Sequence, residues 1–582
     1  MERIPHLISE RSIFNSEWDL TPFDENVAAV LQTELGISGL VSRLLVQRGY
    51  RTPESAERFL NPRLEDLHDP RLLPDFAPAL KEILSAKEEG RKIFIHGDYD
   101  VDGITSAALF SRFLRRIGCE VITHVPHRIR EGYGINMSAV EKAKEEGASV
   151  FLTCDCGSGA TQQIQRAREY GMRIVVTDHH ELHDGDMPDT DAFVNLHRSG
   201  HDYPFDGLSG VGVVFKLCAG IAQELKIDVA QYYRAYLDLA ALGTVADVMS
   251  LVDENRIITA FGCNRIQESR KPGIKALMQH ISIRDGQVTP RTIGYQLGPR
   301  LNAAGRIDDA VLPLRLLLSE DDAESAAIAG QLEAINTDRR EQQDRIIEEA
   351  REKVLAEGLD QETAIVVGSS EWHPGIIGLV AGRLAESFYR PAFVMTYGDS
   401  VAKGSARTIP GYHLADALKR VTALLETHGG HEAAAGFSTK IENVEAFRLA
   451  LQEDAASVLT PDLLVRRRRI DAETTIEECS LDTLHELEQL APFGTGNQEP
   501  TFLARNLTLE SLNPMPSKPQ HVKGTLRSPG GASVEALGFN MAEALEGLRQ
   551  GDRVSVVFEA SINRWNGRER PQWVISDLAR ES

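Results

Sequence analysis

The sequence predicts an α/β protein: a parallel β-sheet, a long helix, a second α/β region and a C-terminal β-barrel. From Lys92 onward, four apolar, β-rich segments alternate with helical stretches, namely RKIFI, EVITHV, SVFLTC and RIVVT. Such alternation is typical of a parallel sheet with crossover helices. Residues 319–358 carry apolar residues at helical spacing and no proline, which predicts one connecting helix. After Pro461, short strand-like segments separated by Gly, Pro and Ser predict a small barrel.

A chain of 582 residues is too long for one hydrophobic core, so several domains are expected. We predict five parts: an N-terminal helical segment (1–75), a first α/β domain (76–318), the connecting helix (319–358), a second α/β domain (359–460) and the barrel (461–582). In the N-terminal segment, VSRLLVQRGY is typical of a short amphipathic helix. TPESAERFLNP predicts another, with Thr52 as its cap and Pro53 in its first position. Helical patterns also dominate from about Val211 to His280.

The composition narrows the class of protein. Apolar residues make up 42% of the chain and charged residues 26%, which is ordinary for a soluble globular protein. A formal charge of −23 argues against a generic nucleic-acid binder, so any DNA-binding surface has to be local. Six cysteines are too few for a disulfide framework, which favours a reducing compartment such as the cytoplasm. We expect neither a secretory signal nor a membrane span.

Acidic and histidine side chains follow three of the predicted strands. HGDYDVDG (96–103) follows RKIFI, TCDCGSG (153–159) ends SVFLTC, and TDHH (177–180) follows RIVV. Ligands of open parallel sheets bind outside the carboxyl ends of the strands, so the three clusters should meet at one edge. Asp247, in LGTVADVM, comes from the helical region that follows and would complete the site.

Carboxylates mixed with imidazoles suit Mg²⁺ or Mn²⁺, and Mn²⁺ matches histidine better. Two divalent ions would neutralise the crowded acids and hold the attacking and leaving oxygens of a phosphoryl displacement. Taken singly, an aspartate-rich loop is often only a helix cap, and DHH is readily explained as a capping aspartate with surface histidines. Three such clusters at successive strand ends favour metal binding. Cys154 and Cys156 have no second cysteine pair near them, so they are expected as buried small side chains rather than zinc ligands.

In their order and spacing, HGDYDVDG, TCDCG, TDHH and GTVADV resemble the four motifs of the DHH phosphoesterase superfamily. Its members include exonucleases, oligoribonucleases, cyclic-dinucleotide phosphodiesterases and inorganic pyrophosphatases. RLNAAGRI, EWHPGIIGLVAGR, GSART and GGHEAAAGF resemble further signatures of its single-stranded-DNA exonuclease branch. The resemblance covers the chain from about residue 40 to the end.

The resemblance implies a role for each residue of the predicted metal site. His96 and Asp100 would hold one ion, and Asp102, His179 and Asp247 would hold the other. Asp155 would bridge the two ions, and Asp98 would support the ligands. His180 would face the scissile phosphate, so that His180, Asp155 and His179 form the implied catalytic set.

The second α/β region resembles the DHH-associated domain, which implies that it binds the nucleic-acid strand. In GSART, Gly404 would let the backbone approach a phosphate, and Ser405 and Arg407 would hydrogen-bond it. His431 in GGHEAAAGF, Arg128 in PHRIREGYG and Arg306 in RLNAAGRI are further candidate contacts. Taken alone, GSART is more often a plain turn, and an isolated arginine is usually a solvated surface residue.

The C-terminal region resembles an OB-fold, a barrel that commonly holds single strands. From Pro461 to Ser582 it contains 14 Lys and Arg against 18 Asp and Glu, so it is net acidic despite the basic cluster RRRR at 466–469. Trp565, Trp573 and Phe558 are candidates for stacking on bases. Aromatic residues of a small barrel are, however, more often part of its core.

Taken as a whole, the resemblance implies a metal-dependent exonuclease that degrades single-stranded DNA from 5′ to 3′, releases 5′-mononucleotides and acts in recombination and repair. It implies a monomer with single-stranded DNA as substrate, and a single-strand-binding protein and a helicase as candidate partners. Two alternatives stay open. One is a phosphodiesterase that uses the same metals on short oligonucleotides or small nucleotides, and the other is a non-catalytic single-strand-binding protein.

Overall fold

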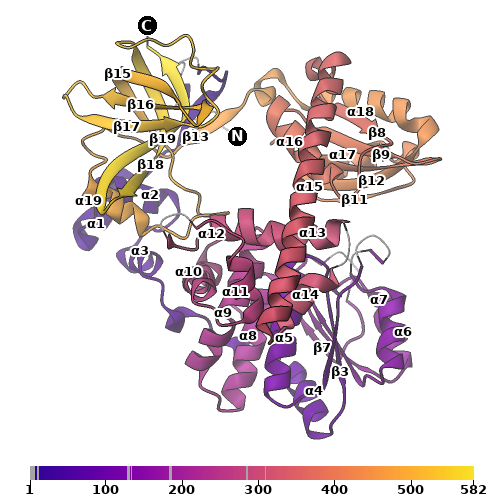
Figure 1. The fold of residues 1–582 in the computed structure, drawn as a ribbon. Coiled ribbons are helices and arrows are strands. Elements are labelled where there is room, and N and C mark those ends of the chain that lie inside the picture. Colours follow the sequence, from indigo (N-terminus) through magenta and orange to yellow (C-terminus); the bar gives the residue numbers. More distant parts are fainter. Residues whose placement is uncertain are drawn as a thin grey trace. The chain divides into compact units, whose positions relative to one another are not determined.

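The computed structural model describes residues 7–8, 12–127, 131–132, 134–182, 187–283, 286–307 and 310–581 (Figure 1). The chain forms two compact units. The sheet unit comprises Asp24–Asn336 and His485–Glu499, and the barrel unit comprises Met1–Phe23, Thr337–Leu484 and Pro500–Ser582. Helix α15 (Asp322–Ala356), 35 residues long, runs from the first unit into the second. It matches the predicted connecting helix.

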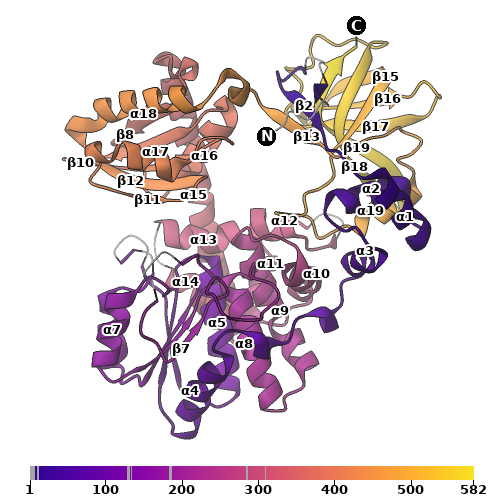
Figure 2. The same cartoon turned by 180° about the vertical axis from the view of Figure 1, so that it is seen from behind.

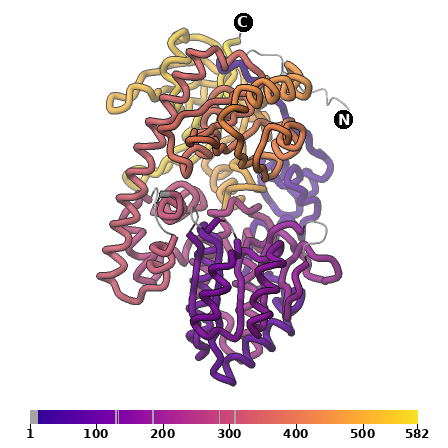
Figure 3. The backbone as a smooth tube through the Cα atoms, turned by 90° about the vertical axis from the view of Figure 1, so that its right-hand side faces the viewer, coloured from indigo at the N-terminus to yellow at the C-terminus, as the bar shows by residue number. Residues whose placement is uncertain are grey.

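The sheet unit is built on a five-stranded parallel sheet in the order β4-β3-β5-β6-β7. Its strands are β3 (Ile93–Gly97), β4 (Val121–His124), β5 (Val150–Cys154), β6 (Arg173–Thr177) and β7 (Ala192–Val194). The four strands that the apolar segments predict are confirmed, and Figure 3 shows their traces running alongside one another. β7 is not predicted from the sequence, because three residues are too few to show a strand pattern. β3 and β5 are buried along their whole length, as expected for parallel strands covered on both faces.

Helices cover both faces of this sheet. On one face, α6 (Met137–Glu145) and α7 (Thr161–Glu169) enclose a core around Phe94, Phe151 and Ile174. The other face packs against α4 (Phe76–Glu88), α5 (Val101–Arg116) and α8 (Gly210–Glu224).

The chain runs from β3 outward to β4 and then back to β5, so the strand order reverses between β3 and β5. A parallel sheet binds ligands outside its carboxyl edge at such a reversal.

Further helices complete the sheet unit. The predicted helical region contains α9 (Val229–Ala246), α10 (Asp253–Gln267) and α11 (Pro272–Met278), and beyond it lie α12 (Pro290–Thr292), the π-helix Ile293–Leu297, α13 (Gly298–Ile307) and α14 (Val311–Leu318). Near the N-terminus lie α1 (Glu25–Leu35), α2 (Gly39–Gln47) and α3 (Pro53–Leu60). Thr52 caps α3 and Pro53 opens it, as predicted. None of the described helices is both long and apolar enough to cross a membrane.

The barrel unit contains the second α/β region, a mixed sheet in the order β11-β12-β10-β9-β8 (Figure 2). Its strands are β8 (Ile365–Ser369), β9 (Ala392–Tyr397), β10 (Val401–Arg407), β11 (Thr427–Gly430) and β12 (Ala434–Lys440). α17 (Leu414–Arg420) and α18 (Val444–Val458) enclose one core with Phe393 and Phe437. α16 (Ile377–Phe388) and the second half of α15 enclose the other core.

The C-terminal strands follow the OB-type arrangement. β15 (Phe502–Met515) pairs with both β16 (Lys518–Arg527) and β18 (Arg553–Trp565). β17 (Ser533–Gly538) pairs with β16 and with β19 (Arg568–Arg580), and β19 pairs with β18. The short strand β14 (Ala472–Glu473) lies beside β15.

The N-terminal segment differs from the prediction, because part of it forms a strand of a separate three-stranded sheet that packs against the barrel. β2 (Glu17–Leu20) pairs with β1 (Leu7–Ile8) and, in parallel, with β13 (Arg467–Ile470). The Trp18 side chain is fully buried, and its indole nitrogen donates to Asp577 at 3.0 Å. Four residues whose partner strand lies near the other end of the chain carry no local pattern from which this pairing could be predicted.

Candidate metal centre

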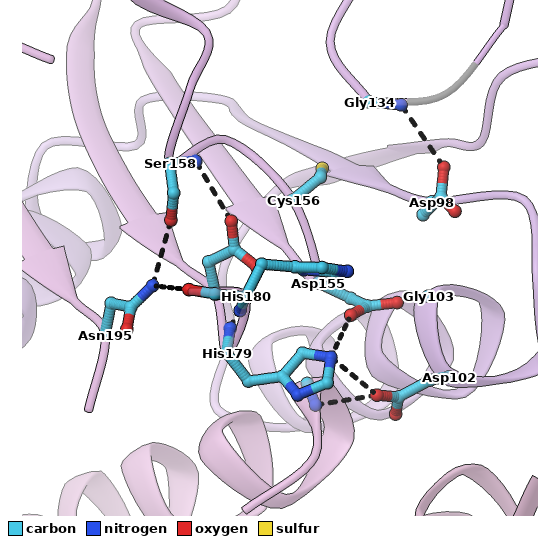
Figure 4. Close-up of polar contacts among 12 residues, drawn as sticks. Asp98, Asp102, Gly103, Gly134, Asp155, Cys156, Ser158, His179, His180 and Asn195 are labelled. Carbon is cyan, nitrogen blue, oxygen red and sulfur yellow. Dashed lines mark hydrogen bonds and ion pairs between the residues drawn. The ribbon is translucent and has the colours of Figure 1, made fainter. Parts of the chain in front are cut away.

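The structure brings the three acid and histidine clusters together at the carboxyl edge of the parallel sheet (Figure 4). Three groups of side chains there have ligand atoms within 4.8 Å of one another: Asp98, Asp100 and Asp155; Asp102, His179 and Asp247; and Asp155, His179 and His180. These groups overlap at Asp155 and His179. They lie where the strand order reverses, which is the position expected for a ligand site in this class of sheet.

His179 lies at the middle of the carboxylates. Its Nε2 is 3.1 Å from Asp155 Oδ1, 3.6 Å from Asp247 Oδ2 and 3.8 Å from Asp102 Oδ2. These three acids come from different elements: Asp155 follows β5, Asp102 lies in the first turn of α5, and Asp247 ends α9. The fold thus unites residues that are far apart in the sequence.

Two loop conformations hold the acids in place. The Asp102 carboxylate accepts backbone N–H bonds from Gly210 (2.7 Å) and Val211 (2.8 Å) at the start of α8. Gly210 also lets Asp155 lie close to the start of α8, because a Cβ on Gly210 would be 2.6 Å from the Asp155 side chain. Asp155 itself has a positive φ of 61°, which aspartate tolerates better than most residues. Strained conformations of this kind cluster at functional sites.

The turn after β3 is equally constrained. Asp100 caps α5 and accepts a hydrogen bond from the Gly103 N–H at 3.0 Å. A Cβ on Gly103 would lie 2.5 Å from the backbone of Asp98, so the tight turn that gathers the three aspartates requires glycine here.

His96 lies at the end of β3 and belongs to none of the three groups among the described residues. Its ring is fully buried, with Nε2 3.2 Å from the Gly134 carbonyl oxygen. Nδ1 makes no hydrogen bond within the part of the chain that the structure describes. The implied role of His96 as a ligand stays a prediction.

His180 is held by residues to which the sequence analysis gave no role. Its Nδ1 lies 2.8 Å from Oδ1 of the buried Asp178, whose Oδ2 accepts the Ser158 N–H at 2.9 Å. Asn195 donates to the His180 carbonyl (3.0 Å) and to Ser158 Oγ (2.9 Å), as Figure 4 shows. The sequence offers only a weak indication of Asn195. It is the polar residue directly after AFV, the short strand β7, which is not predicted from the sequence.

The electrostatics of the site suit divalent cations. Burial, reinforced by the charge of Asp100, raises the pKa of Asp98 and that of Asp247 to about 7. Burial and neighbouring carboxylates raise the pKa of Asp102 and of Asp155 well above the ordinary range. Burial lowers the pKa of His179 to about 4, so its imidazole is neutral at pH 7.

The carboxylates repel one another, and the neutral imidazole of His179 offers a lone pair to a metal ion. Asp155 Oδ1 is buried and, apart from its 3.1 Å contact with His179 Nε2, has no hydrogen-bond partner among the described residues. This donor set of carboxylates and neutral imidazoles fits Mn²⁺ or Mg²⁺.

The pKa of His180 is shifted in the opposite direction from that of His179. Burial alone would lower its pKa, but the hydrogen bond and charge of Asp178 raise that pKa to about 9. His180 is therefore cationic at neutral pH. A cation beside a metal site is suited to an anionic substrate such as a phosphate.

The raised carboxyl pKa values predict an unusual pH dependence when metal is removed. In EDTA, the melting temperature should fall as the pH rises from about 4 to 7. A carboxyl group whose folded pKa is about 7, against an ordinary 3.8, binds more protons in the native state, and its stability contribution is lost as the pH rises. The decline should be shallower in Asp98→Asn, as scanning calorimetry of both proteins would show. Equal slopes would contradict the raised pKa of Asp98.

In the second α/β region, the structure places the two predicted motifs side by side. Arg407 in β10 pairs with Ala434 in β12, whose carbonyl accepts the His431 N–H at 2.9 Å. Ser405 and Arg407 lie two residues apart on one strand, hence on the same face. The Arg407 guanidinium donates to the Ala406 carbonyl at 2.8 Å.

Gly404, Arg306 and Arg128 are the three remaining candidates for phosphate contacts. A Cβ on Gly404 would lie 2.1 Å from the Phe437 ring, so the structure explains this glycine by packing rather than by approach to a phosphate. Arg306 lies in α13, where a Cβ on its neighbour Gly305 would be 3.4 Å from the Tyr99 carbonyl in the aspartate-rich turn. Arg128 lies outside the described residues.

The three aromatic candidates of the barrel differ in their exposure to solvent. Trp573 and Phe558 are buried and stack with ring centroids 3.6 Å apart, so they belong to the core. Trp565 is 74% exposed. It borders a groove of about 970 Å³ with Lys523, Arg568 and Arg570.

Two arginines of the basic cluster 466–469 form ion pairs within the barrel unit. Arg468 pairs with the buried Asp577 at 2.9 Å, and Arg467 pairs with Glu17 at 3.4 Å. The cluster therefore joins β13 to its neighbours. Its charge is partly compensated there.

Known protein families match most of these parts. Residues 92–244 match the DHH family N-terminal domain, residues 360–457 match the DHHA1 domain, and residues 470–577 match the RecJ OB domain.

Individual relatives match over nearly the whole chain. The single-stranded-DNA-specific exonuclease RecJ of Bacillus subtilis (strain 168) is 38% identical, over 97% of this chain and 70% of the relative. RecJ of Salmonella typhimurium (strain LT2) is 34% identical, over 93% of this chain and 95% of the relative. The crystal structure of RecJ in complex with Mn²⁺ from Thermus thermophilus superposes with a TM-score of 0.83 and 28% identity, covering 97% of this chain and 80% of the other.

Proposed function

Because the chain belongs to the family of the single-stranded-DNA-specific exonuclease RecJ, we propose that it is a metal-dependent exonuclease. Its substrate is single-stranded DNA, which it degrades from the 5′ end to 5′-mononucleotides, in recombination and repair. The observation that carries the proposal is the convergence of Asp100, Asp102, Asp155, His179 and Asp247 at one edge of the parallel sheet.

In this proposal the edge would hold two divalent ions, Mn²⁺ or Mg²⁺. His96 and Asp100 would hold one ion, Asp102, His179 and Asp247 would hold the other, and Asp155 would be a ligand of both. When bound, such ions supply Lewis acidity and neutralise charge on the phosphoryl group. Asp155 shares one group of neighbouring ligand atoms with Asp100 and another with His179, which supports its assignment to both ions.

The side chains of the protein contribute orientation and charge. Asp178 engages His180 Nδ1, which orients the ring so that Nε2 is the nitrogen for the scissile phosphate. The cationic imidazole binds the anionic phosphate and is able to donate a proton to it. Asn195 and Ser158 keep the backbone and the partner acid of His180 in place.

The second α/β region holds the strand end in this proposal. Ser405, Arg407 and His431 bind the terminal phosphate, and Arg306 and Arg128 bind phosphates of the strand. The adjacency of the two motifs in β10, β12 and the turn before β12 supports a common subsite.

An end-labelling experiment tests the activity. A single-stranded oligonucleotide labelled at the 5′ or the 3′ end is incubated with Mn²⁺ or Mg²⁺, and the products are sized. A labelled mononucleotide should appear first from the 5′-labelled strand, while the 3′-labelled strand shortens progressively. Cleavage restricted to dinucleotides or cyclic dinucleotides would favour a small-molecule phosphodiesterase. Binding that survives EDTA without any product would favour a non-catalytic binder.

We also propose an oligomeric state, a location and partners for the protein. The protein acts as a monomer, which light scattering after size exclusion tests. It works in the cytoplasm, in keeping with six unpaired, buried cysteines. A single-strand-binding protein and a helicase are its candidate partners by family resemblance.

The barrel groove gives a separate prediction. Trp565→Ala should weaken the binding of long single strands about five- to a hundredfold, because base stacking on an aromatic side chain contributes roughly 1–3 kcal/mol. The groove lies over β16, β17 and the β18–β19 hairpin, where OB-folds commonly bind strands. Fluorescence anisotropy on long and very short oligonucleotides measures the effect, which should vanish for the short ones. Phe539→Ala, another exposed aromatic of the barrel, is the matched control. Unchanged affinity in Trp565→Ala would exclude the groove.

A further inference from the structure

We propose that residues 485–499 are a positioning element of the metal centre: they clamp the loop that follows Asp247 and thereby fix the direction of its carboxylate. The inference rests on the proposed metal site. It adds residues that neither bind metal nor touch substrate.

The loop after Asp247 has a conformation that local sequence does not favour. Asp247 ends α9, and Val248 adopts a positive φ of 60°. A β-branched residue is a genuine outlier there, and glycine usually occupies this position after a helix. Such a conformation persists only where the surroundings impose it. What holds residues 248–251 therefore also holds Asp247.

The turn itself is closed by α9, because the Val248 and Met249 N–H groups donate to the carbonyls of Val245 (3.1 Å) and Thr244 (3.3 Å). The two residues that follow, Ser250 and Leu251, lie directly against residues 494–496. The Leu251 N–H donates to the Thr495 carbonyl at 2.7 Å. A Cβ on Gly494 would lie 2.6 Å from Leu251 Cδ1. Gly496 has a φ of +73°, and a Cβ on it would lie 1.9 Å from Ser250 Oγ. Both glycines thus let the side chains of Ser250 and Leu251 pack closely against the backbone of residues 494–496.

The clamp is itself anchored to the sheet unit. The buried Asn497 donates to the carbonyls of Leu490 (2.8 Å) and Pro492 (2.9 Å), which fixes the shape of the segment. The buried Arg256, from α10, donates to the Leu490 carbonyl at 2.9 Å and to that of Gln489 at 3.1 Å. These bonds use side chains that have no role in the proposed chemistry.

The clamp is covalently connected at both of its ends to the barrel unit. Residues 485–499 lie in the chain between β14 and β15, two barrel strands that pair through Ala472 and Phe502. The segment leaves the barrel unit, supports the loop of a metal ligand and returns.

The test uses Gly496→Ala in the full chain. The added methyl group would lie 1.9 Å from Ser250 Oγ and 3.1 Å from its Cβ, so at least the Ser250 hydroxyl has to move, and we expect the loop that follows Asp247 to shift with it. Mn²⁺ affinity, read without DNA from the paramagnetic resonance signal of free Mn²⁺, should fall roughly tenfold or more, as is typical when residues that support metal ligands are changed. Hydrolysis of a single-stranded oligonucleotide should fall with it, while circular dichroism stays native. Gly496→Ala combined with Ser250→Gly should recover part of the affinity.

Gly147→Ala is the matched control. Gly147 has the same φ of +73° and belongs to the same unit, but a Cβ on it would meet nothing within 4 Å. It should bind Mn²⁺ as the wild type does. Asn497→Ala, which releases the clamp without a clash, should share the direction of Gly496→Ala.

Wild-type Mn²⁺ affinity in Gly496→Ala, or loss of the native fold in both clamp variants, would overturn the proposal and leave the segment a structural tie. A wild-type protein that binds Mn²⁺ but cleaves no DNA would instead contradict the proposed function. The two failures are therefore distinguishable.

Discussion

Asp155→Asn should abolish DNA hydrolysis without destabilising the metal-free protein. Asparagine has the size of aspartate and tolerates the left-handed backbone found at this position, with φ of 61°. It removes the negative charge that we place between the two ions. Metal ions supply several kcal/mol of transition-state stabilisation, so the rate should fall by roughly 10³-fold or more. The rate is measured on a single-stranded oligonucleotide at saturating Mn²⁺.

Stability should change in the opposite sense. Without metal, the Asp155 carboxylate is buried among other acids, and its pKa is raised well above the ordinary range. Removing it relieves repulsion, so the melting temperature in EDTA should stay equal or rise. The increase of the melting temperature on adding Mn²⁺ should shrink, because stabilisation by a ligand follows its affinity. Asp189→Asn, at an exposed position, is the control. Substantial cleavage by a well-folded Asp155→Asn protein would refute the two-ion assignment.

The sequence predicts the sheet unit well, because its strands are runs of β-rich residues followed by helices. Thr52 and Pro53 even mark the start of α3. The misses have one cause, which is that the pattern is absent from the local sequence. β7 is three residues long, and β2 pairs with β13, which lies 450 residues further along the chain (Glu17 opposite Arg467).

Some residues of the metal centre can likewise be predicted from the sequence, and others cannot. The clusters at strand ends can be predicted, since parallel strands end at a common edge. The residues that hold them cannot. Asp102 is held by the start of α8, and His180 is held by Asp178 and Asn195. Nothing in the sequence near Asp247 points to Thr495 or Gly496, because their contacts arise from a segment that arrives more than two hundred residues later in the chain.

Arg407→Ala should remove most of the preference for a 5′-phosphate over a 5′-hydroxyl end. Arg407 and Ser405 lie on one face of β10, beside Gly378 at the start of α16, where a Cβ would be 3.0 Å from Ser405 Oγ. A hydroxyl and a guanidinium thus meet the start of a helix, an arrangement that favours a dianionic phosphate. Hydrogen bonds to charged groups contribute roughly 1.5–3 kcal/mol, so cleavage of 5′-phosphorylated strands should slow about ten- to a hundredfold.

The conservative variant separates charge from geometry. Arg407→Lys keeps the charge but loses the planar fork of donors, so it should recover only part of the rate. Arg383→Ala, an exposed arginine of α16 paired with Glu386, is the matched control and should behave as the wild type does. Mn²⁺ affinity should be unchanged in all three variants, because Arg407 lies outside the ligand groups. The measurement is the cleavage rate on matched strands with either 5′ end. If Arg407→Ala slows both strands equally, Arg407 holds the strand in general and does not recognise its terminal phosphate.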